Sequence, residues 1–598
     1  MTEAGRLFLG VERSIGGRRW VHALETAAEA VSLRIAQEHG LPEIVGRILA
    51  ARGVAAADAL AFLTPSLRDL MPDPSALTDM EPAAARLADA IERRERIAVF
   101  GDYDVDGAAS AALMTRYLAA FGLVPDIRIP DRILEGYGPN PQAMRELAQA
   151  GATLIVTVDC GTTSHEAVAA ANEAGADVVV LDHHQTGPLL PAARAVVNPN
   201  RQDDLSGQGH LCAAGVVFLT LVAVSRELRR RGARSGDLPD LLALLDLVAL
   251  ATVCDVVPLI GLNRAFVVKG LQVLRQQKNP GIRALCRLAR ISGPVDCYHL
   301  GFLVGPRINA GGRIGDASLG SRLLTMDEDS DAVVLAEQLH QLNEERQAME
   351  RQMLAEAEAE VSNELGASSE GPPVLVAARE HWHPGIVGLI AARLKERYGR
   401  PAFAIAFGRD GKGTGSGRSI DGFDLGALVR AAVADGLLVK GGGHAMAAGI
   451  TIERPRLGDF RAFVEERATS SVASLRRADA LRLDGAVSAM GLTGALWERL
   501  EQAGPYGAGH PQPVLVLPRH RITSASVVGN GHVRATLRGE DGASVSAIAF
   551  RAEGSEVGQR LLGRAGGPLH VAGTVTMDRY RGREDIRLRI VDMAETVD

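Results

Sequence analysis

Between residues 96 and 181 the sequence alternates short apolar runs with alanine- and leucine-rich stretches, and this alternation restricts the fold more than any other feature. We expect strands at 96–101, 125–129, 153–158 and 177–181, and helices at 108–119, 140–150 and 164–174. Strands that alternate with helices form a parallel sheet with helices on its faces. In such sheets a ligand lies outside the carboxyl ends of the strands. We therefore expect an α/β protein with a functional site at that edge.

The first expected strand leads into FGDYDVDG, Phe100 to Gly107, which places three aspartates at alternate positions. Carboxylates this close repel one another unless they share a cation or strong hydrogen-bond donors. The pattern resembles a calcium-binding EF-hand loop, but position twelve of such a loop would be Leu113, which cannot bind a cation. The flanks also differ, because an EF-hand is helix, loop, helix and this segment is strand, loop, helix. The EF-hand interpretation is rejected.

Further acidic and imidazole residues follow the other expected strands. Asp159 ends TLIVTVDCG, Asp182 precedes the pair His183–His184 in DVVVLDHH, and Asp255 follows the helical run 238–252. Each signal alone has a structural alternative, since a strand-end aspartate is often a helix cap and a histidine pair often lies in a polar surface or a core. Together they favour a carboxylate-rich site for Mg²⁺ or Mn²⁺, and imidazole favours Mn²⁺. Two such ions about 4 Å apart, bridged by one carboxylate, would suit phosphoester hydrolysis.

Composition sets the broad class. A chain of 598 residues is too long for a single core, so three or four domains are expected. No apolar run is long enough to cross a membrane, and the N-terminus lacks the apolar segment of a secretion signal. The five cysteines form no CxxC pair, which is typical of free thiols in a reducing cytoplasm. A net charge of −7 gives no sign of nucleic-acid binding, and composition alone favours a solvated face for the basic stretch 393–418.

The remaining segments complete the expected organisation. A stretch without proline or glycine, with leucines and methionines at helical spacing, predicts a long connector helix. Beyond residue 513 short alternating runs such as HVRATLR and SVSAIAF predict a small antiparallel barrel. The expected domains are an N-terminal helical segment (1–90), a parallel-sheet domain (91–328), the connector (329–368), a second α/β domain (369–475) and the barrel domain (476–598).

The motifs DYDVDG, VDCG, DHH and CDVVP, in this order, resemble those of the DHH phosphoesterase family. GPRINAGGR (305–313), HPGIVGLIAARL from His383, SGRS (416–419) and GGGHAMAAG (441–449) resemble its branch with a DHHA1 domain. GPYGAGHPQP from Gly504 precedes the barrel, and the whole pattern is similar to the RecJ exonucleases of bacteria. The resemblance covers the chain from about residue 60 and implies DHH, DHHA1 and OB-fold domains.

The resemblance also implies roles for single residues. The implied ligands of two divalent cations, Mn²⁺ or Mg²⁺, are Asp104, Asp106, Asp159, His183 and Asp255. Asp159 would bridge the ions, Asp182 would orient His183, and His184 would lie near the scissile phosphate. Phe100 is a departure, because many relatives have a histidine at this position. Asp102 is either a helix cap or an outer group of the site.

A second implied set would bind phosphates of a strand, including its 5′ end. It consists of Arg307, Asn309, Arg313, Ser416, Arg418, Gly442, Gly443 and His444. Backbone N–H groups freed by glycines, together with arginine and serine, form anion pockets. Without the resemblance, a flexible turn and a solvated arginine would be the better interpretation. In the barrel, Tyr506 and Tyr580 are candidates for stacking on bases.

The implied activity is metal-dependent 5′-to-3′ hydrolysis of single-stranded DNA to 5′-mononucleotides, in DNA repair and recombination. A single-strand-binding protein and a RecQ-type helicase are candidate partners of a monomeric chain. Two alternatives stay open. One is another DHH-family phosphohydrolase acting on nanoRNA, cyclic dinucleotides or pyrophosphate, although such enzymes usually lack the barrel. The other is a non-catalytic scaffold of the replication machinery, in which the acidic motifs would have decayed.

Overall fold

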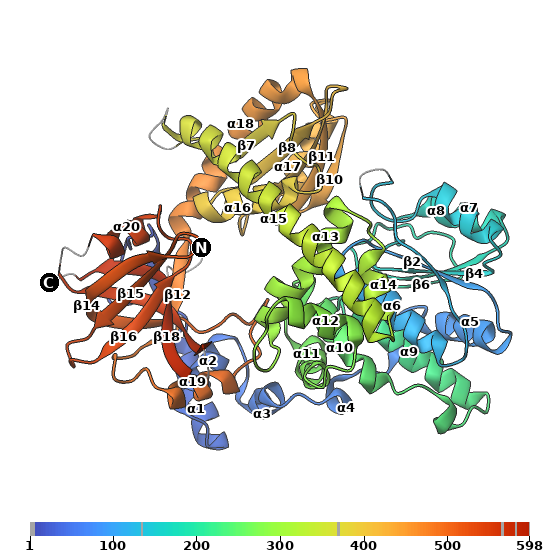
Figure 1. Cartoon of the computed structure of the whole chain (residues 1–598), viewed down its shortest axis with the longest axis horizontal. Coiled ribbons are helices and arrows are strands. Elements are labelled where there is room, and N and C mark those ends of the chain that lie inside the picture. Colours follow the sequence, from blue (N-terminus) through green and yellow to red (C-terminus); the bar gives the residue numbers. More distant parts are fainter. Residues whose placement is uncertain (1–5, 133–134, 367–370, 564–566, 581–582, 597–598) are drawn as a thin grey trace. The chain divides into compact units, whose positions relative to one another are not determined.

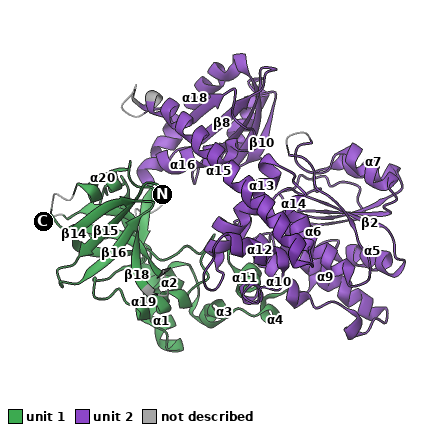
Figure 2. Ribbon diagram, in the orientation of Figure 1, with its two compact units in different colours: residues 1–71, 258–268, 479–598 green, residues 72–257, 269–478 purple. Residues whose placement is uncertain are grey.

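The computed structural model describes residues 6–132, 135–366, 371–563, 567–580 and 583–596 (Figure 1). The chain divides into two compact units, which Figure 2 shows in different colours. Unit 1 comprises residues 1–71, 258–268 and 479–598, and unit 2 comprises residues 72–257 and 269–478. Unit 2 contains both α/β regions, and unit 1 contains the barrel. Among the described helices, none has the length and apolar character needed to cross a membrane.

The first sheet of unit 2 has five parallel strands in the order β3-β2-β4-β5-β6. They are β2 (Ile97–Gly101), β3 (Asp126–Arg128), β4 (Leu154–Val158), β5 (Asp177–Leu181) and β6 (Ala195–Val197). The helices that alternate with them are α6 (Val105–Ala119), α7 (Pro141–Gln149) and α8 (His165–Glu173). Every residue of β2 and β4 is buried, as expected for strands with helices on both faces. The predicted parallel α/β fold is confirmed.

A group of helices continues this domain. Helix α6 packs against α9 (Ala213–Arg230) and α10 (Leu245–Cys254), and α5 (Met80–Glu92) packs against α9. This packing brings the start of α9 and the end of α10 to the sheet edge where β2 ends. Beyond α10, the π-helix η6 (His299–Val304) runs directly into α13 (Gly305–Ile314) and contacts α10.

Helix α15 (Asp329–Gly366) is the predicted connector within unit 2. Its first half packs against α12 (Pro280–Leu288), α13 and α14 (Leu319–Thr325), and buries Leu335 and Leu339. Its second half packs against α16 (Val387–Tyr398) and β7 (Leu375–Arg379), and buries Met353 in the core of the second sheet. One apolar stripe therefore contributes to two cores.

The second sheet of unit 2 is mixed, in the order β10-β11-β9-β8-β7. Strands β7 and β8 (Ala402–Phe407) are parallel, and the other neighbours are antiparallel. The remaining strands are β9 (Lys412–Arg418), β10 (Lys440–His444) and β11 (Ala447–Glu453). Helices α17 (Leu425–Ala434) and α18 (Leu457–Ala478) complete its core.

The C-terminal region of unit 1 is a closed barrel, as predicted. Five strands form it in the order β14-β15-β16-β18-β17, and the pairing of β14 with β17 closes it. They are β14 (Leu515–Val528), β15 (His532–Arg538), β16 (Ser544–Ala549), β17 (Leu569–Tyr580) and β18 (Arg583–Glu595). Alternate positions of β15 are buried, which matches the period-2 pattern that predicted the strand.

The N-terminal segment up to residue 71 belongs to the unit of the barrel, although it was predicted only as a helical segment spanning 1–90. Strand β1 (Arg19–His22) pairs in parallel with β12 (Ala480–Leu483). The buried carboxylate of Asp592 accepts hydrogen bonds from the Ser14 hydroxyl (2.7 Å) and the Trp20 indole (3.0 Å). Residues 72–90 belong to unit 2.

The segment GPYGAGHPQP has a structural role in unit 1. The fully buried guanidinium of Arg264 donates hydrogen bonds to the carbonyls of Ala503, Gly504 and Pro505. Arg264 also lies over the Phe62 ring, with its Cζ 3.9 Å from the ring centroid. The short segment 258–268 is therefore fixed to unit 1, while the chain on either side of it belongs to unit 2.

Candidate metal centre and phosphate pocket

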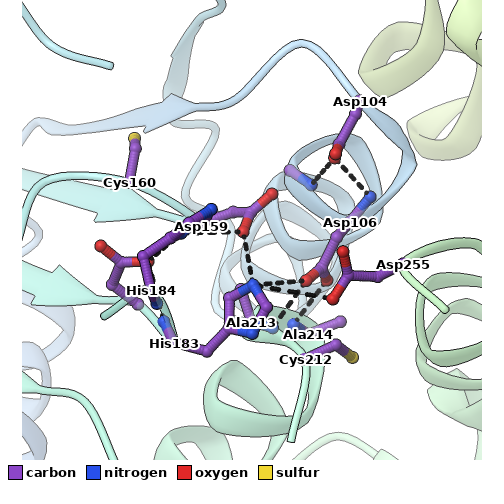
Figure 3. A network of polar contacts seen from close by, with 12 residues as sticks. Asp104, Asp106, Asp159, Cys160, His183, His184, Cys212, Ala213, Ala214 and Asp255 are labelled. Atoms are coloured by element: carbon purple, nitrogen blue, oxygen red, sulfur yellow. Dashed lines mark hydrogen bonds and ion pairs between the residues drawn. The ribbon is translucent and has the colours of Figure 1, made fainter. Parts of the chain in front are cut away.

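Strands β2, β4 and β5 end at one edge of the first sheet, and acidic or imidazole residues follow each of them. Further carboxylates come from the first turn of α6 and the end of α10. Figure 3 shows the side chains of Asp106, Asp159, His183 and Asp255 pointing toward a common centre. The residues at this edge are Asp102, Asp104, Asp106, Asp159, His183, His184 and Asp255.

Three carboxylates surround the Nε2 atom of His183. The distances from this nitrogen are 3.3 Å to Asp159 Oδ1, 3.7 Å to Asp255 Oδ2 and 3.8 Å to Asp106 Oδ2. The other ring nitrogen, Nδ1, lies 3.0 Å from the Leu211 carbonyl oxygen, which fixes the ring and directs Nε2 at the carboxylates. Residues distant in the sequence therefore converge on one point, as Figure 3 shows.

Two of the aspartates also cap helices. Asp104 Oδ1 accepts hydrogen bonds from the backbone N–H groups of Asp106 (2.9 Å) and Gly107 (3.2 Å), and so caps α6. The carboxylate of Asp106 accepts hydrogen bonds from the N–H groups of Ala213 (2.7 Å) and Ala214 (2.8 Å) at the start of α9. Capping and metal binding are compatible, because each carboxylate oxygen has two lone pairs. The caps hold both carboxylates in fixed orientations.

The ligand atoms form three groups, in each of which they lie within 4.8 Å of one another. The groups are Asp159–His183–His184, Asp106–His183–Asp255 and Asp102–Asp104–Asp159. Asp159 belongs to the first and third of these groups, and His183 belongs to the first and second. Oxygen and imidazole donors of this kind suit Mg²⁺ and Mn²⁺.

Burial and mutual repulsion make this a site that a cation would stabilise. Burial, followed by the charges of Asp106 and Asp104, raises the pKa of Asp255 to about 9. The pKa values of Asp159 and Asp102 are also raised well above the usual range, first by burial and then by neighbouring carboxylates. Among the described residues, none donates a hydrogen bond to the buried atoms Asp159 Oδ1, Asp255 Oδ2 and Asp102 Oδ1. Unsatisfied buried oxygens that face one another fit a divalent cation.

The sequence suggested that Asp182 orients the ring of His183. In the structure its carboxylate instead contacts the ring of His184. Asp182 Oδ1 lies 2.8 Å from His184 Nδ1 and accepts the backbone N–H of His183 (2.8 Å). Its other oxygen accepts the hydroxyl (2.7 Å) and N–H (3.1 Å) of Thr162. Burial acts to raise the pKa of Asp182, but the bonds from His184 and Thr162 outweigh it and hold this pKa well below the usual range. Burial lowers and Asp182 raises the pKa of His184, which reaches about 9.

Tyr137 is a residue of this site that sequence reasoning missed. Its hydroxyl donates to the backbone carbonyl of Asp159 (3.2 Å) and lies 3.1 Å from His184 Nδ1. The phenol ring is half exposed and meets the His184 ring edge-on. Tyr137 lies in the loop between β3 and α7, where no periodic pattern marks it.

Phe100 and Asp102 have different surroundings. Phe100 is fully buried in the core with Met144 and Cys160, so it offers no ligand atom. Asp102 is buried at the start of the loop, where a Cβ on Gly107 would lie 2.4 Å from its carbonyl oxygen. Glycine at 107 is therefore needed for the loop to fold back on Asp102. In the group with Asp104 and Asp159, Asp102 has a carboxylate available to a cation.

Unit 2 also contains a cationic pocket, a cavity of about 180 Å³. Its lining includes Asp131, Arg132, Arg313 and His383. Burial, followed by repulsion from Arg132, Arg346 and Arg418, lowers the pKa of Arg313 to about 10. Burial, followed by repulsion from Arg132, also lowers the pKa of Arg418. Several arginines thus lie close enough to repel one another, which an anion would relieve.

Close backbone contacts fix these arginines. A Cβ on Gly385 would lie 2.1 Å from the Arg313 carbonyl oxygen, so glycine is required where the start of the α16 segment meets α13. Arg313 Nη1 donates to the Gly385 carbonyl (3.2 Å), and Arg418 Nη1 donates to the Ser416 hydroxyl (2.8 Å). The structure therefore brings together Arg313, Ser416 and Arg418 and adds Arg132, which the sequence did not indicate.

Tyr103 connects the two sites. It lies between Asp102 and Asp104 in the acidic loop, and its ring faces Arg132, whose Cζ lies 4.9 Å from the ring centroid. A Cβ on Gly312 would lie 2.6 Å from the Tyr103 carbonyl oxygen, so α13 packs tightly on this loop just before Arg313. Adjacent residues of one loop therefore contact the metal centre and the cationic pocket.

The remaining residues that were predicted to contact phosphates lie on β10 and in α13. Strand register places Ser416, Gly449 and Gly442 in one row across β9, β11 and β10, so Gly442 is about 10 Å from Ser416. Gly443 and His444 are exposed on the same edge strand. Arg307 donates to the Leu303 carbonyl of η6, and Asn309 is half-buried in α13.

Of the two tyrosines considered for base stacking, Tyr506 stacks on the buried His510 with ring centroids 5.2 Å apart and packs in the N-terminal core. The Tyr580 side chain lies outside the described part of the chain. The described barrel has a different exposed aromatic, Phe550, with the guanidinium of Arg589 5.1 Å from its centroid.

Three family models match the chain: DHH family, N-terminal domain, over residues 96–252; DHHA1 domain over 371–470; and RecJ OB domain over 483–592. The single-stranded-DNA-specific exonuclease RecJ of Dickeya dadantii is 36% identical over 92% of this chain and 96% of its own length. The crystal structure of RecJ with Mn²⁺ from Thermus thermophilus superposes with a TM-score of 0.76 at 30% identity, covering 95% of this chain and 78% of that one. The structure with Mg²⁺ gives 0.71 at 28% identity, over 95% and 77% of the two chains. The acidic and imidazole groups described above are positioned to bind a divalent cation such as the ions in these two structures.

Proposed function

This chain belongs to the RecJ family of the DHH phosphoesterases, and we propose that it hydrolyses single-stranded DNA from the 5′ end, releasing 5′-mononucleotides, with two divalent cations at the acidic centre. The observation that carries the proposal is the convergence of Asp106, Asp159 and Asp255 on His183 Nε2, at 3.3–3.8 Å. A role in DNA repair and recombination is part of the same proposal.

One group of residues at this centre would bind the ions, and another would contact the substrate. Asp159 would bridge the two ions, with Asp104 on one side and Asp106, His183 and Asp255 on the other. Bound there, divalent cations polarise the scissile phosphate and lower the pKa of an attacking water. His184, kept protonated near neutral pH by Asp182, is proposed to donate a hydrogen bond to a phosphate oxygen.

The cationic pocket supports the proposed polarity. Arg132, Arg313 and Arg418 together would hold a terminal 5′-phosphate, which carries more charge than an internal phosphodiester. Tyr103 contacts this pocket while its neighbours Asp102 and Asp104 face the metal centre. Because these residues are consecutive in the chain, the two sites lie close together. This arrangement favours the release of one nucleotide at a time.

The barrel supplies an additional surface for the strand. Arg534, Ile548 and Arg589 occupy one row across β15, β16 and β18, and both arginines are exposed. Phe550 lies close to this row and meets the His532 ring with centroids 5.0 Å apart. Arginines beside an exposed aromatic ring are the elements of single-strand binding by OB-folds.

The test is a time course on one strand labelled at either its 5′ or its 3′ end, with Mg²⁺, Mn²⁺ or a chelator. The 5′ label should appear in mononucleotides from the first time point, while the 3′-labelled strand shortens gradually, and chelation should stop both. Early mononucleotides from the 3′ end, or undiminished digestion under chelation, would contradict the proposal. A blunt duplex should be resistant and a 5′-tailed duplex should be degraded.

The same assay separates the alternatives. An enzyme for short RNA, cyclic dinucleotides or pyrophosphate would hydrolyse those compounds faster than a long strand. A non-catalytic scaffold would bind the strand and leave it intact. The acidic and imidazole residues that remain in place argue against the scaffold, and the barrel argues against the other phosphohydrolases.

A further inference from the structure

An exposed aromatic pair on and next to η6, which contacts the end of α10 just before Asp255, has no role in the account above. Tyr298 and Phe302 stack with ring centroids 5.2 Å apart and an interplanar angle of 25°. Tyr298 is 53% exposed and Phe302 is 70% exposed. Two large apolar rings that stack on each other in water form a flat, ordered surface. We call this pair the aromatic platform.

The platform is anchored to the element that carries Asp255. Leu300, between the two aromatic residues, accepts a hydrogen bond from the Cys254 thiol through its carbonyl (3.5 Å). A Cβ on Gly305 would lie 2.5 Å from Cys254 Sγ, so glycine is required where α13 begins against the end of α10. Cys254 directly precedes Asp255, so the platform and this proposed metal ligand are held by the same contacts.

Local geometry fits a binding role. Phe302 lies in the π-helix η6 and Tyr298, four residues earlier, directly precedes this helix. The wider turn of a π-helix is often found at functional sites. Arg307 lies in α13, which continues η6, and donates to the Leu303 carbonyl. The carboxylate of the neighbouring Asp296 lies 2.7 Å from His299 Nδ1 and accepts the backbone N–H of His299 (2.9 Å). Exposed Val256, next to Asp255, adds apolar surface.

We propose that the aromatic platform stacks on a base of the single strand whose backbone passes the metal centre. The proposal rests on the proposed function. Every nucleobase has a face that stacks on an aromatic ring, so a platform beside the cleavage site would hold the strand without selecting a sequence. Stacking also requires an unpaired base, which would contribute to the preference for single strands over duplex.

The first test is kinetic and uses the full chain with the double substitution Tyr298→Ala and Phe302→Ala. The KM for a long single strand should rise about ten-fold, while kcat stays within about two-fold of the parent, because stacking holds the strand and takes no part in the chemistry. Tyr298→Phe and Phe302→Trp should keep the parental KM. Val124→Ala, at an exposed apolar residue in the same unit, is the matched control and should change neither constant.

The second test reports on stacking itself. Strands carrying one 2-aminopurine at successive positions are bound to Asp159→Ala protein, which leaves the strand intact. The parental platform should quench the fluorescence at one or two positions, and the double alanine substitution should remove that quenching. If the parent digests single strands but the double variant retains both the parental KM and the quenching, the platform does not bind bases and is a surface for another partner. If the parent digests no single strand at all, the proposed function fails first.

Discussion

The acidic centre and the cationic pocket of unit 2 are built on the same principle with opposite charge. Each buries several like charges close together, so burial and repulsion raise the pKa of Asp255 to about 9 and lower the pKa of Arg313 to about 10. Carboxylates with such raised pKa values can take up protons when no cation is present, whereas Arg313 stays charged at neutral pH. A bound cation would therefore stabilise the acidic centre, and a bound anion would stabilise the cationic pocket. A metal-bound nucleotide strand supplies both.

The largest expected effect comes from removing the shared carboxylate. Asp159→Asn keeps the volume of the side chain but removes its charge, and should lower kcat by at least about 10³-fold, the order lost when a main electrostatic stabiliser is removed. Initial rates on a labelled single strand measure this. The matched control is Asp177→Asn, at the opposite end of β5, which should keep the parental kcat. Equal rates for Asp159→Asn and the parent would show that the acidic centre takes no part in the chemistry.

A smaller effect is expected from the cationic pocket. Arg313→Gln should raise the KM for a 5′-phosphorylated strand by about 10- to 100-fold, the range for losing a charge-assisted hydrogen bond. The same variant should lose most of its discrimination between 5′-phosphate and 5′-hydroxyl ends. Arg322→Gln, at an exposed arginine of the same unit, serves as the control. If Arg313→Gln keeps the parental preference for a 5′-phosphate, this pocket does not bind the strand's end.

The smallest effect is on stability, and it separates the two regions without any substrate. Mn²⁺ should raise the thermal transition of unit 2 by several degrees, since an ion at a hundred times its Kd contributes about 2.7 kcal/mol. Asp255→Asn should lose this shift and should raise the metal-free transition slightly, because one repelling carboxylate is removed. Arg313→Gln should retain the Mn²⁺ shift. An undiminished shift in Asp255→Asn would place the ion elsewhere.

Much of unit 2 could be predicted because its signals are local. Apolar runs of strand length, separated by helical stretches, predicted β2, β4 and β5 within one residue of their observed bounds. The parallel topology then places Asp159 and His183 at one edge, because carboxyl ends of parallel strands meet there. The proposed metal ligands follow from this rule and from the family resemblance together.

Other features have no local signal. Arg132 and Tyr137 lie between β3 and α7 and outside any helix or strand, so only the folded chain shows that they reach the cationic pocket and His184. The partner that orients the His183 ring is a backbone carbonyl, Leu211, which any residue type could provide. The attachment of the N-terminal segment to the barrel depends on Asp592, almost the whole chain away.

The most direct measurement of the central claim is the location of the ions. Crystals of the protein grown with Mn²⁺ and measured at the manganese absorption edge would show the ions by their anomalous scattering. The account predicts two peaks bridged by Asp159, one beside Asp104 and one enclosed by Asp106, His183 and Asp255. Peaks elsewhere, or none at this edge of the sheet in protein that digests single strands, would contradict it.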